Sequence, residues 1–133
     1  MGIFRHIADE ISILILDRIT RRLEWSQGCG SVIKAKIILF NPGYDFNGRG
    51  GAIEREYQRR RLWPVSKDVL KRLNMAEPSL SKIFPNATCV WSAGKGRKLS
   101  FVTFVHGTSR NRSKDDFIWE GEWWFAGVSQ WQP

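Results

Sequence analysis

The chain has 133 residues, of which 42% are hydrophobic and 26% are charged, and its formal net charge is +8. A chain of this length predicts one domain over residues 1–133 with a sizeable core, and the composition excludes a disordered protein. The longest apolar run is too short to cross a bilayer and follows two acidic residues. We therefore expect a cytoplasmic protein that makes no membrane contact.

The positive charge is concentrated in the middle of the chain. Residues 49–114 hold fifteen Lys and Arg against four Asp and Glu, whereas residues 115–133 hold four acidic residues and no Lys or Arg. A basic segment of this kind indicates a polyanionic partner at one surface. Cations spread evenly over the solvated surface would give the same count, so the spatial arrangement decides between the two interpretations.

The first element, residues 3–23, fits two structures. Apolar residues recur every four positions, and acidic residues lie early and arginines late, which predicts a helix with one apolar stripe. Ile19, Leu23 and Trp25 also share one parity with earlier isoleucines, as on one face of a strand. We predict the helix and keep the strand as the alternative.

A strand, a glycine-rich loop and a helix follow. Lysines alternate with apolar residues early in Val32–Phe40, and its far end is apolar, which predicts a strand. A turn at 41–43 and the loop NGRGG lead into a helix from Ala52 that ends at Trp63-Pro64, because the residue before proline avoids helical angles. A glycine loop that opens a helix offers unpaired N–H groups, so this junction is a candidate anion site.

The next segments predict further helix and then sheet. Ser66 caps a helix over Lys67–Asn74, and residues 79–84 form one more helical turn. Strands are expected at Thr88–Trp91 and Leu99–His106, joined as a hairpin. Residues 107–114 are expected to form a polar, basic loop.

The last segment, Phe117–Gln130, predicts one bent strand or two short strands around Gly121. Its alternating faces are both apolar: one carries Phe117, Trp119, Trp123 and Phe125, and the other Trp124, Ala126 and Val128. Such a strand is central in its sheet or covered on both sides. The predicted fold is a single α+β domain, with helices mainly in the first two-thirds and an antiparallel sheet dominated by the C-terminal third.

Three basic clusters, each near aromatic residues in the sequence, are candidate contacts for a polyanion. Cations bind phosphates and aromatic rings stack on bases, so nucleic acid is the favoured partner. The predicted contact residues are Arg49, Arg55, Arg59, Arg60, Arg61, Lys95, Arg97, Lys98, Arg110 and Arg112. The leading hypothesis is therefore a small basic binding protein without catalysis and without a cofactor.

Two other hypotheses stand beside it. The first is a tryptophan-lined pocket that makes the protein a small-ligand binder or an enzyme, because paired carboxylates raise one another's pKa and serve as acid and base. Its residues are His106, Trp119, Glu120, Glu122 and Trp123. The second is an oligomeric interaction protein that uses exposed tryptophans as anchors of a homo-oligomer interface.

One short motif resembles a known family. The segment FVHGTSRNR, followed by GEWWFAG, resembles in miniature the histidine-glycine strand of ADP-ribosyltransferases. In that family a His-Gly pair, often followed by Thr or Ser, lies against nicotinamide dinucleotide, which implies that role for His106, Gly107 and Thr108. The family has a far longer stretch after its histidine than the one that follows here. The histidines and cysteines have no zinc spacing, so no metal site is predicted.

Overall fold

The computed structural model describes residues 17–26, 28, 30–91 and 98–129. Its elements are β1 (Arg18–Ser26), β2 (Val32–Phe40), β3 (Asn47–Gly48), α2 (Gly50–Arg59), β4 (Trp63–Pro64), α3 (Lys67–Ala76), α4 (Leu80–Ile83), β5 (Asn86–Trp91), β6 (Leu99–Val105), β7 (Thr108–Ser113), β8 (Trp119–Glu120) and β9 (Trp124–Val128). Strands hold 46% of the described residues and helices 23%. The prediction of an α+β domain is therefore wrong, because the chain is mostly β and its helices are few and small.

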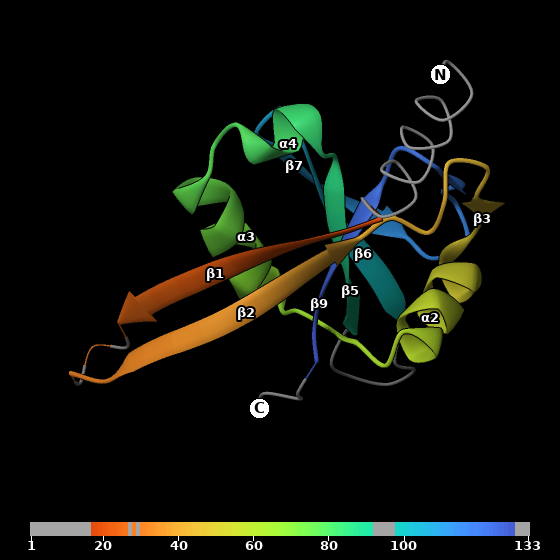
Figure 1. The fold of residues 1–133 in the computed structure, drawn as a ribbon. Coiled ribbons are helices and arrows are strands. Elements are labelled where there is room, and N and C mark those ends of the chain that lie inside the picture. The colour runs from red at the N-terminus through yellow and green to blue at the C-terminus, as the bar shows by residue number, and fades with distance from the viewer. Residues whose placement is uncertain (1–16, 27, 29, 92–97, 130–133) are drawn as a thin grey trace, which may run out of the picture.

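The main sheet has seven strands, in the order β1-β2-β9-β5-β6-β7, with β4 beside β9 (Figure 1). All neighbouring strands are antiparallel except β5 and β9, which run parallel, so the sheet is mixed. Strands from both ends of the chain meet in this sheet, and it is not confined to the C-terminal third. A separate two-stranded sheet joins β3 and β8.

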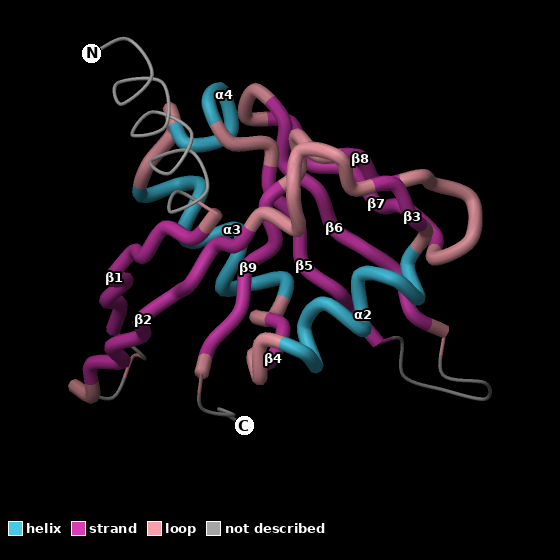
Figure 2. The backbone as a smooth tube through the Cα atoms, turned by 45° about the vertical axis from the view of Figure 1, so that its right-hand side comes forward, coloured by secondary structure: helices cyan, strands magenta, loops and turns pink. Residues whose placement is uncertain are grey.

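Helices cover both faces of the main sheet (Figures 1 and 2). On one face, Ile53 and Tyr57 of α2 pack into a cluster that includes Phe125. On the other face, Leu70 and Leu73 of α3 pack into a second cluster, together with residues of α4, β1 and β2. The core is thus divided in two by the sheet, with α2 on one side and α3 and α4 on the other.

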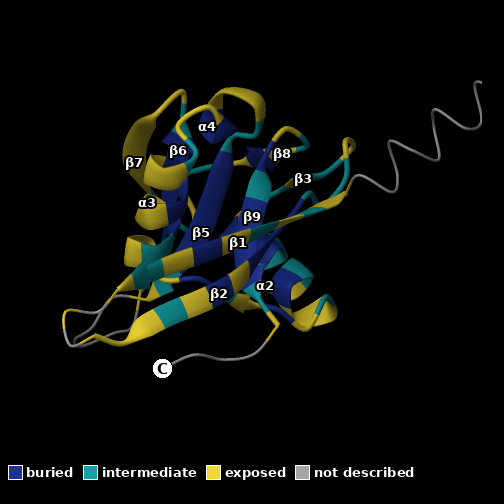
Figure 3. Ribbon diagram, turned by 60° about the vertical axis from the view of Figure 1, so that its left-hand side comes forward, coloured by how far each residue is buried: buried dark blue, intermediate teal, exposed yellow. Residues whose placement is uncertain are grey.

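Strand β9 lies in the middle of this arrangement and confirms the prediction from its alternating faces. Phe125 belongs to the α2-side cluster, and Ala126 belongs to the α3-side cluster. The strand pairs with β2 on one edge and with β5 and β4 on the other. Figure 3 shows most of β9 in dark blue, the colour of buried residues.

Strand β1 corrects the helix predicted for residues 3–23. Residues 18–23 are strand, paired with β2 over nine positions from Arg18 opposite Phe40 to Ser26 opposite Val32. The alternative reading by parity is the right one, because Ile19, Leu23 and Trp25 all pack on the α3 side. Residues 3–16 of the predicted helix lie outside the described residues.

The remaining helix predictions are close to the structure. Helix α2 begins two residues before Ala52, and α3 is capped by Ser66, whose Oγ accepts a hydrogen bond from the Val69 N–H at 3.2 Å. Asn74 at the end of α3 and Asn86 at the start of β5 donate amide hydrogens to each other's side-chain oxygens at 2.8 and 3.0 Å. Because both asparagines are buried, this reciprocal pair ties α3 to the sheet in one register.

The polar loop predicted over residues 107–114 is wrong, because residues 108–113 form strand β7 on the edge of the sheet. Val105 and Thr108 are paired, so His106 and Gly107 form a two-residue turn, with φ of 49° and 79°. Two positive φ values define the hairpin turn whose twist matches the flanking strands. His106 and Gly107, on which the resemblance to ADP-ribosyltransferases depends, therefore lie in this turn, and Thr108 is the first residue of β7.

This turn yields a stability prediction. The substitution His106→Asn is expected to raise the free energy of unfolding by about 0.5 kcal/mol. Asparagine adopts left-handed backbone angles more readily than histidine does, and Asn-Gly is the preferred residue pair for this turn. Urea unfolding followed by circular dichroism measures the change. His106→Val is the control of opposite sign, since a β-branched residue is strained at positive φ. Equal stability of the two variants would contradict the turn assignment.

Candidate functional site

The arginines predicted at the end of α2 have different roles. Arg60 is packed: its side chain is 12% exposed, pairs with Glu56 at 2.8 Å and lies over the Phe40 ring at 4.7 Å. Arg59 also pairs with Glu56, at 2.7 Å, but keeps 67% of its side chain in solvent. Arg61 is exposed. Only Arg59 and Arg61 are therefore available to a partner at this end of the helix.

The junction that opens α2 is closed by the protein itself. The Gly50 N–H donates to the Lys114 carbonyl at 3.1 Å, and Arg49 donates to the Asp115 carbonyl. A side chain on Gly50 would meet Lys114 Cγ at 2.6 Å and Phe101 at 2.9 Å. Glycine is therefore needed at position 50 for close packing. The first N–H of the helix is already hydrogen-bonded within the protein, so it is not available to the anion that the loop was predicted to bind.

The other predicted cations lie elsewhere. Arg55 is exposed on α2, and Arg110 is exposed on β7, at the opposite edge of the sheet from β1. Arg112 is half-buried over the Phe117 ring, 4.8 Å from its centroid. Lys98 is exposed, whereas Lys95 and Arg97 lie outside the described residues. The described members of the predicted set are thus distributed over α2, the residues that flank it, β7 and the residue before β6.

A cationic surface does form, from residues that the sequence analysis did not select. Arg18, Arg22, Lys34 and Lys36 all have even numbers on β1 or β2 and are exposed, on the opposite side of the hairpin from Leu23. We call these four residues and their side of the hairpin the hairpin face. Arg22 stands directly opposite Lys36, and Glu24 opposite Lys34. Their period-two spacing is visible in the sequence once residues 18–26 are interpreted as a strand.

The hairpin face belongs to a two-stranded ribbon that extends beyond the rest of the sheet (Figures 1 and 3). Strand β2 pairs with β9 only through residues 38–40, so residues 32–37 pair with β1 alone. The reverse side of the ribbon is anchored on α3, where Arg72 lies over the Trp25 ring at 5.4 Å and Arg21 pairs with Glu77 nearby at 2.8 Å. The packed side fixes the ribbon and leaves its cationic side in solvent.

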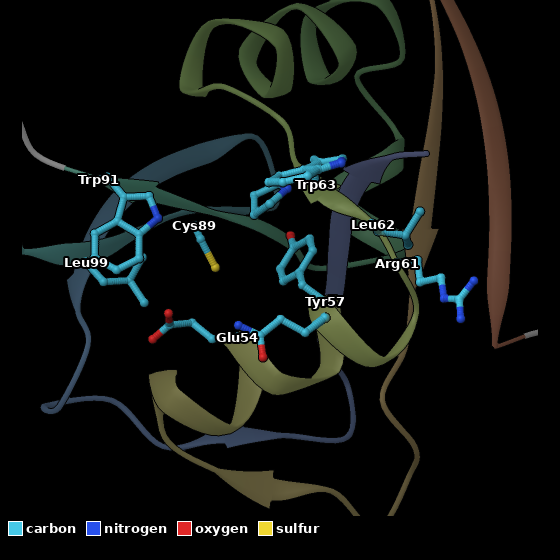
Figure 4. A pocket seen from close by; sticks show the side chains of 10 residues that line it. Glu54, Tyr57, Arg61, Leu62, Trp63, Cys89, Trp91 and Leu99 are labelled. Carbon is cyan, nitrogen blue, oxygen red and sulfur yellow. The ribbon is translucent and has the colours of Figure 1, made fainter. Parts of the chain in front are cut away.

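The end of α2 and the base of the ribbon share one electrostatic environment. Partial burial lowers the pKa of Arg60, Glu56 opposes the shift, and the positive charges of Arg59 and Arg18 add to the lowering. Arg60 also lies 4.0 Å from Asp17, just before β1. In Figure 4 the Arg61 side chain points toward the side on which β1 and β2 lie. Arg59 and Arg18 therefore both act on Arg60, and Arg61 points to the same side of the molecule.

The predicted tryptophan-lined pocket is not assembled. Trp119 and Trp123 are buried in the core with their ring centroids 5.0 Å apart. Glu120 and Glu122 do come together, in a shallow exposed depression beside Tyr44, Asp45, Phe46 and Asn47. His106 lies in the turn between β6 and β7, where its backbone N–H donates a hydrogen bond to the Ser81 carbonyl at 3.1 Å.

A different cavity, of about 450 Å³, lies between α2 and strands β4, β5 and β6 (Figure 4). Its walls include Glu54 and Tyr57 of α2, Trp63 of β4, and Cys89 and Trp91 of β5; Gln58, Arg61, Leu62, Pro64 and Leu99 complete the lining. Trp63 is 52% exposed and Trp91 is 47% exposed, so both indole rings border the opening. We call this the Trp63–Trp91 cavity.

Two buried groups in this cavity have strongly perturbed acidity. Burial raises the pKa of the Cys89 thiol well above its ordinary value, and nearby Glu54 adds to the shift. Burial also raises the pKa of Tyr57, with Cys89 contributing and a hydrogen bond to Thr88 opposing. The Tyr57 hydroxyl donates to the Ala126 carbonyl at 2.7 Å. Both groups are therefore neutral at physiological pH, and Cys89 is a poor nucleophile in the folded protein.

Other functional classes receive no support from the described residues. No group of three or more His, Cys, Asp and Glu side chains in this part of the chain is placed to hold a metal ion. None of its helices has the length and apolar character needed to span a membrane. Comparison with known proteins finds no match, whether among family models, curated proteins or solved structures.

The neutral thiol yields a prediction about pH. Because the unfolded chain releases the Cys89 proton near pH 8.5 and the folded chain retains it, stability is fully present below that pH and decreases as pH rises further. Between pH 8 and pH 10 we expect the free energy of unfolding to fall by about 2 kcal/mol from this group. Urea unfolding at both values measures the change.

Cys89→Ala is the matched variant for this measurement, since it removes the titrating group and keeps every other one. Its stability is expected to fall less over the same pH interval, by the share that Cys89 contributes. Parallel pH profiles for the two proteins would show that Cys89 is not protected from ionisation in the folded state.

Proposed function

We propose that this protein binds a polyanion, with nucleic acid as the favoured partner, through the hairpin face and the exposed arginines Arg59 and Arg61. The observation that carries the proposal is the ribbon that extends beyond the sheet, with four exposed cations on its solvent side. Among the described residues, no ion pair joins Arg22, Lys34 or Lys36 to a carboxylate.

The cross-strand pair of Arg22 and Lys36 supports this function. Like charges directly opposite each other on a β-ladder destabilise it, by an amount of the order of 0.2–1 kcal/mol. A phosphate lying between the two side chains would remove that repulsion. Glu24 lies on the same face, opposite Lys34, but among the described residues no ion pair joins Arg22 or Lys36 to a carboxylate. The repulsion in the unbound ribbon therefore favours an anionic partner.

The shape of the ribbon favours a nucleic acid duplex over a small anion. Six residues of β2 beyond the β9 pairing extend for roughly 20 Å at the usual rise of a strand. A two-stranded ribbon fits the major groove of B-form DNA, which is about 12 Å wide. Cations spaced along such a ribbon can contact successive phosphates, whereas a single small anion would engage only one or two of them.

Neutralising the central pair tests the proposal. The double variant Arg22→Gln/Lys36→Gln is expected to bind a duplex of about 20 base pairs more weakly, because two phosphate contacts are lost. The slope of log binding constant against log salt concentration should decrease in magnitude by about two. Fluorescence anisotropy of a labelled duplex over a series of salt concentrations measures both quantities.

The matched control changes the same net charge on the other side of the molecule. Lys67 and Lys82 lie exposed on α3 and α4, across the sheet from α2, and Lys67→Gln/Lys82→Gln should leave the salt slope unchanged. Equal weakening of both double variants would mean that only net charge attracts the duplex. Failure of the unsubstituted protein to bind duplex or heparin at low salt would remove the proposal altogether.

A further inference from the structure

The Trp63–Trp91 cavity has the composition of a site for a flat ring. Figure 4 places Trp63 and Trp91 at two sides of the cavity, with Cys89 between them and Glu54 and Tyr57 extending from α2. A volume of about 450 Å³ lies within the range of ordinary small-molecule sites. Two half-exposed indole rings are costly on a surface and supply large stacking areas to a planar guest.

The polar groups of the cavity select among planar guests. Gln58 offers an amide, and Glu54 offers carboxylate oxygens that accept hydrogen bonds. The carboxylate is already paired with the Lys114 ammonium at 3.1 Å, and Arg61 also lines the cavity. An organic cation would therefore meet a neutralised acid and a neighbouring arginine. A neutral heterocycle with N–H donors on its edge suits these groups better, because amide and carboxylate oxygens recognise such edges.

Arg61 adds an independent observation. It follows α2 with φ of 56°, and the Leu62 N–H donates to the Tyr57 carbonyl at 3.0 Å, while the Arg61 N–H donates to the Gln58 carbonyl at 3.1 Å. This is the helix C-terminal motif in which glycine is the usual residue at the left-handed position. Arginine is strained there, and such strain is typically retained at functional sites. The strained residue lies in the wall of the cavity, whereas its guanidinium points toward the side on which β1 and β2 lie (Figure 4).

We propose that the Trp63–Trp91 cavity binds an unpaired nucleobase, stacked against Trp63, with the polar edge of the base toward Gln58 and Glu54. The base comes either from a free mononucleotide or from a single-stranded segment. This site is separate from the hairpin face, which contacts phosphates alone, and it does not depend on the function proposed for that face.

Calorimetric titration with defined probes tests the site. Adenosine 5′-monophosphate and cytidine 5′-monophosphate represent the free nucleotides, and ribose 5-phosphate carries the anion without the base. Sodium decanoate supplies an anionic aliphatic chain and tetramethylammonium an organic cation. We expect binding of a nucleotide and no measurable binding of the other three probes. Binding of decanoate or tetramethylammonium with no binding of either nucleotide would overturn the proposal.

Substitutions assign the binding to the cavity. Trp63→Ala should weaken nucleotide binding roughly 5- to 150-fold, the range for losing one stacked aromatic ring, and Trp63→Phe should restore most of it. Tyr44→Ala is the matched control, because Tyr44 is an aromatic residue that is 84% exposed and does not line the cavity. Equal effects of Trp63→Ala and Tyr44→Ala would overturn the assignment, and so would failure of the Phe variant to recover binding.

Two further arms distinguish the sources of the base and the two proposed surfaces. The affinity of an eight-nucleotide single strand is compared with that of the same strand made abasic and with that of the free nucleotide. If the intact strand binds more strongly than both, the site takes its base from single strands. If the intact strand binds no more strongly than the free nucleotide, the site takes mononucleotides. Arg22→Gln/Lys36→Gln should keep mononucleotide binding, and Trp63→Ala should keep duplex binding. Loss of mononucleotide binding in the hairpin variant would contradict an independent cavity.

Discussion

Strand β9 is the element on which the rest of the structure depends. It is hydrogen-bonded along both edges, to β2 on one side and to β5 and β4 on the other, and its alternate residues enter the two separate halves of the core. Phe125 and Ala126 are both fully buried, on opposite faces. A one-residue slip would exchange those faces, so β9 fixes the register of the strands around it. Both candidate surfaces follow from this register.

The position of β9 explains why the ribbon and the cavity exist. Because β9 is short, it pairs with only the last residues of β2, and the rest of the β1–β2 hairpin extends past it. On its other edge, β9 accepts β4 and β5 together, and the space between these strands and α2 becomes the Trp63–Trp91 cavity. The two surfaces are therefore both products of a short central strand with longer neighbours.

The charged residues divide into those that stabilise the fold and those that remain for a partner. Arg60, Arg72 and Arg112 lie over aromatic rings and contribute packing as well as charge. Arg22 and Lys36 stand directly opposite each other on the hairpin face and lie over no aromatic ring among the described contacts. Net charge by itself made all five equivalent. In the folded protein these residues differ in whether the side chain contacts an aromatic ring or a carboxylate.

The sequence alone determined β2, the helices α2 and α3, the β5–β6 hairpin and the two-faced character of β9, because in each a local pattern agrees with the final environment. The pattern of residues 18–23 fits both a helix, which we predicted, and a strand. Only pairing with β2 decided for the strand, since strand pairing is a non-local interaction. The same holds for β7, whose polar residues become a strand through the turn at His106 and the edge of β6. Tertiary structure also decided which cations share a surface, because side chains separated along the chain meet only when the strands that carry them are aligned.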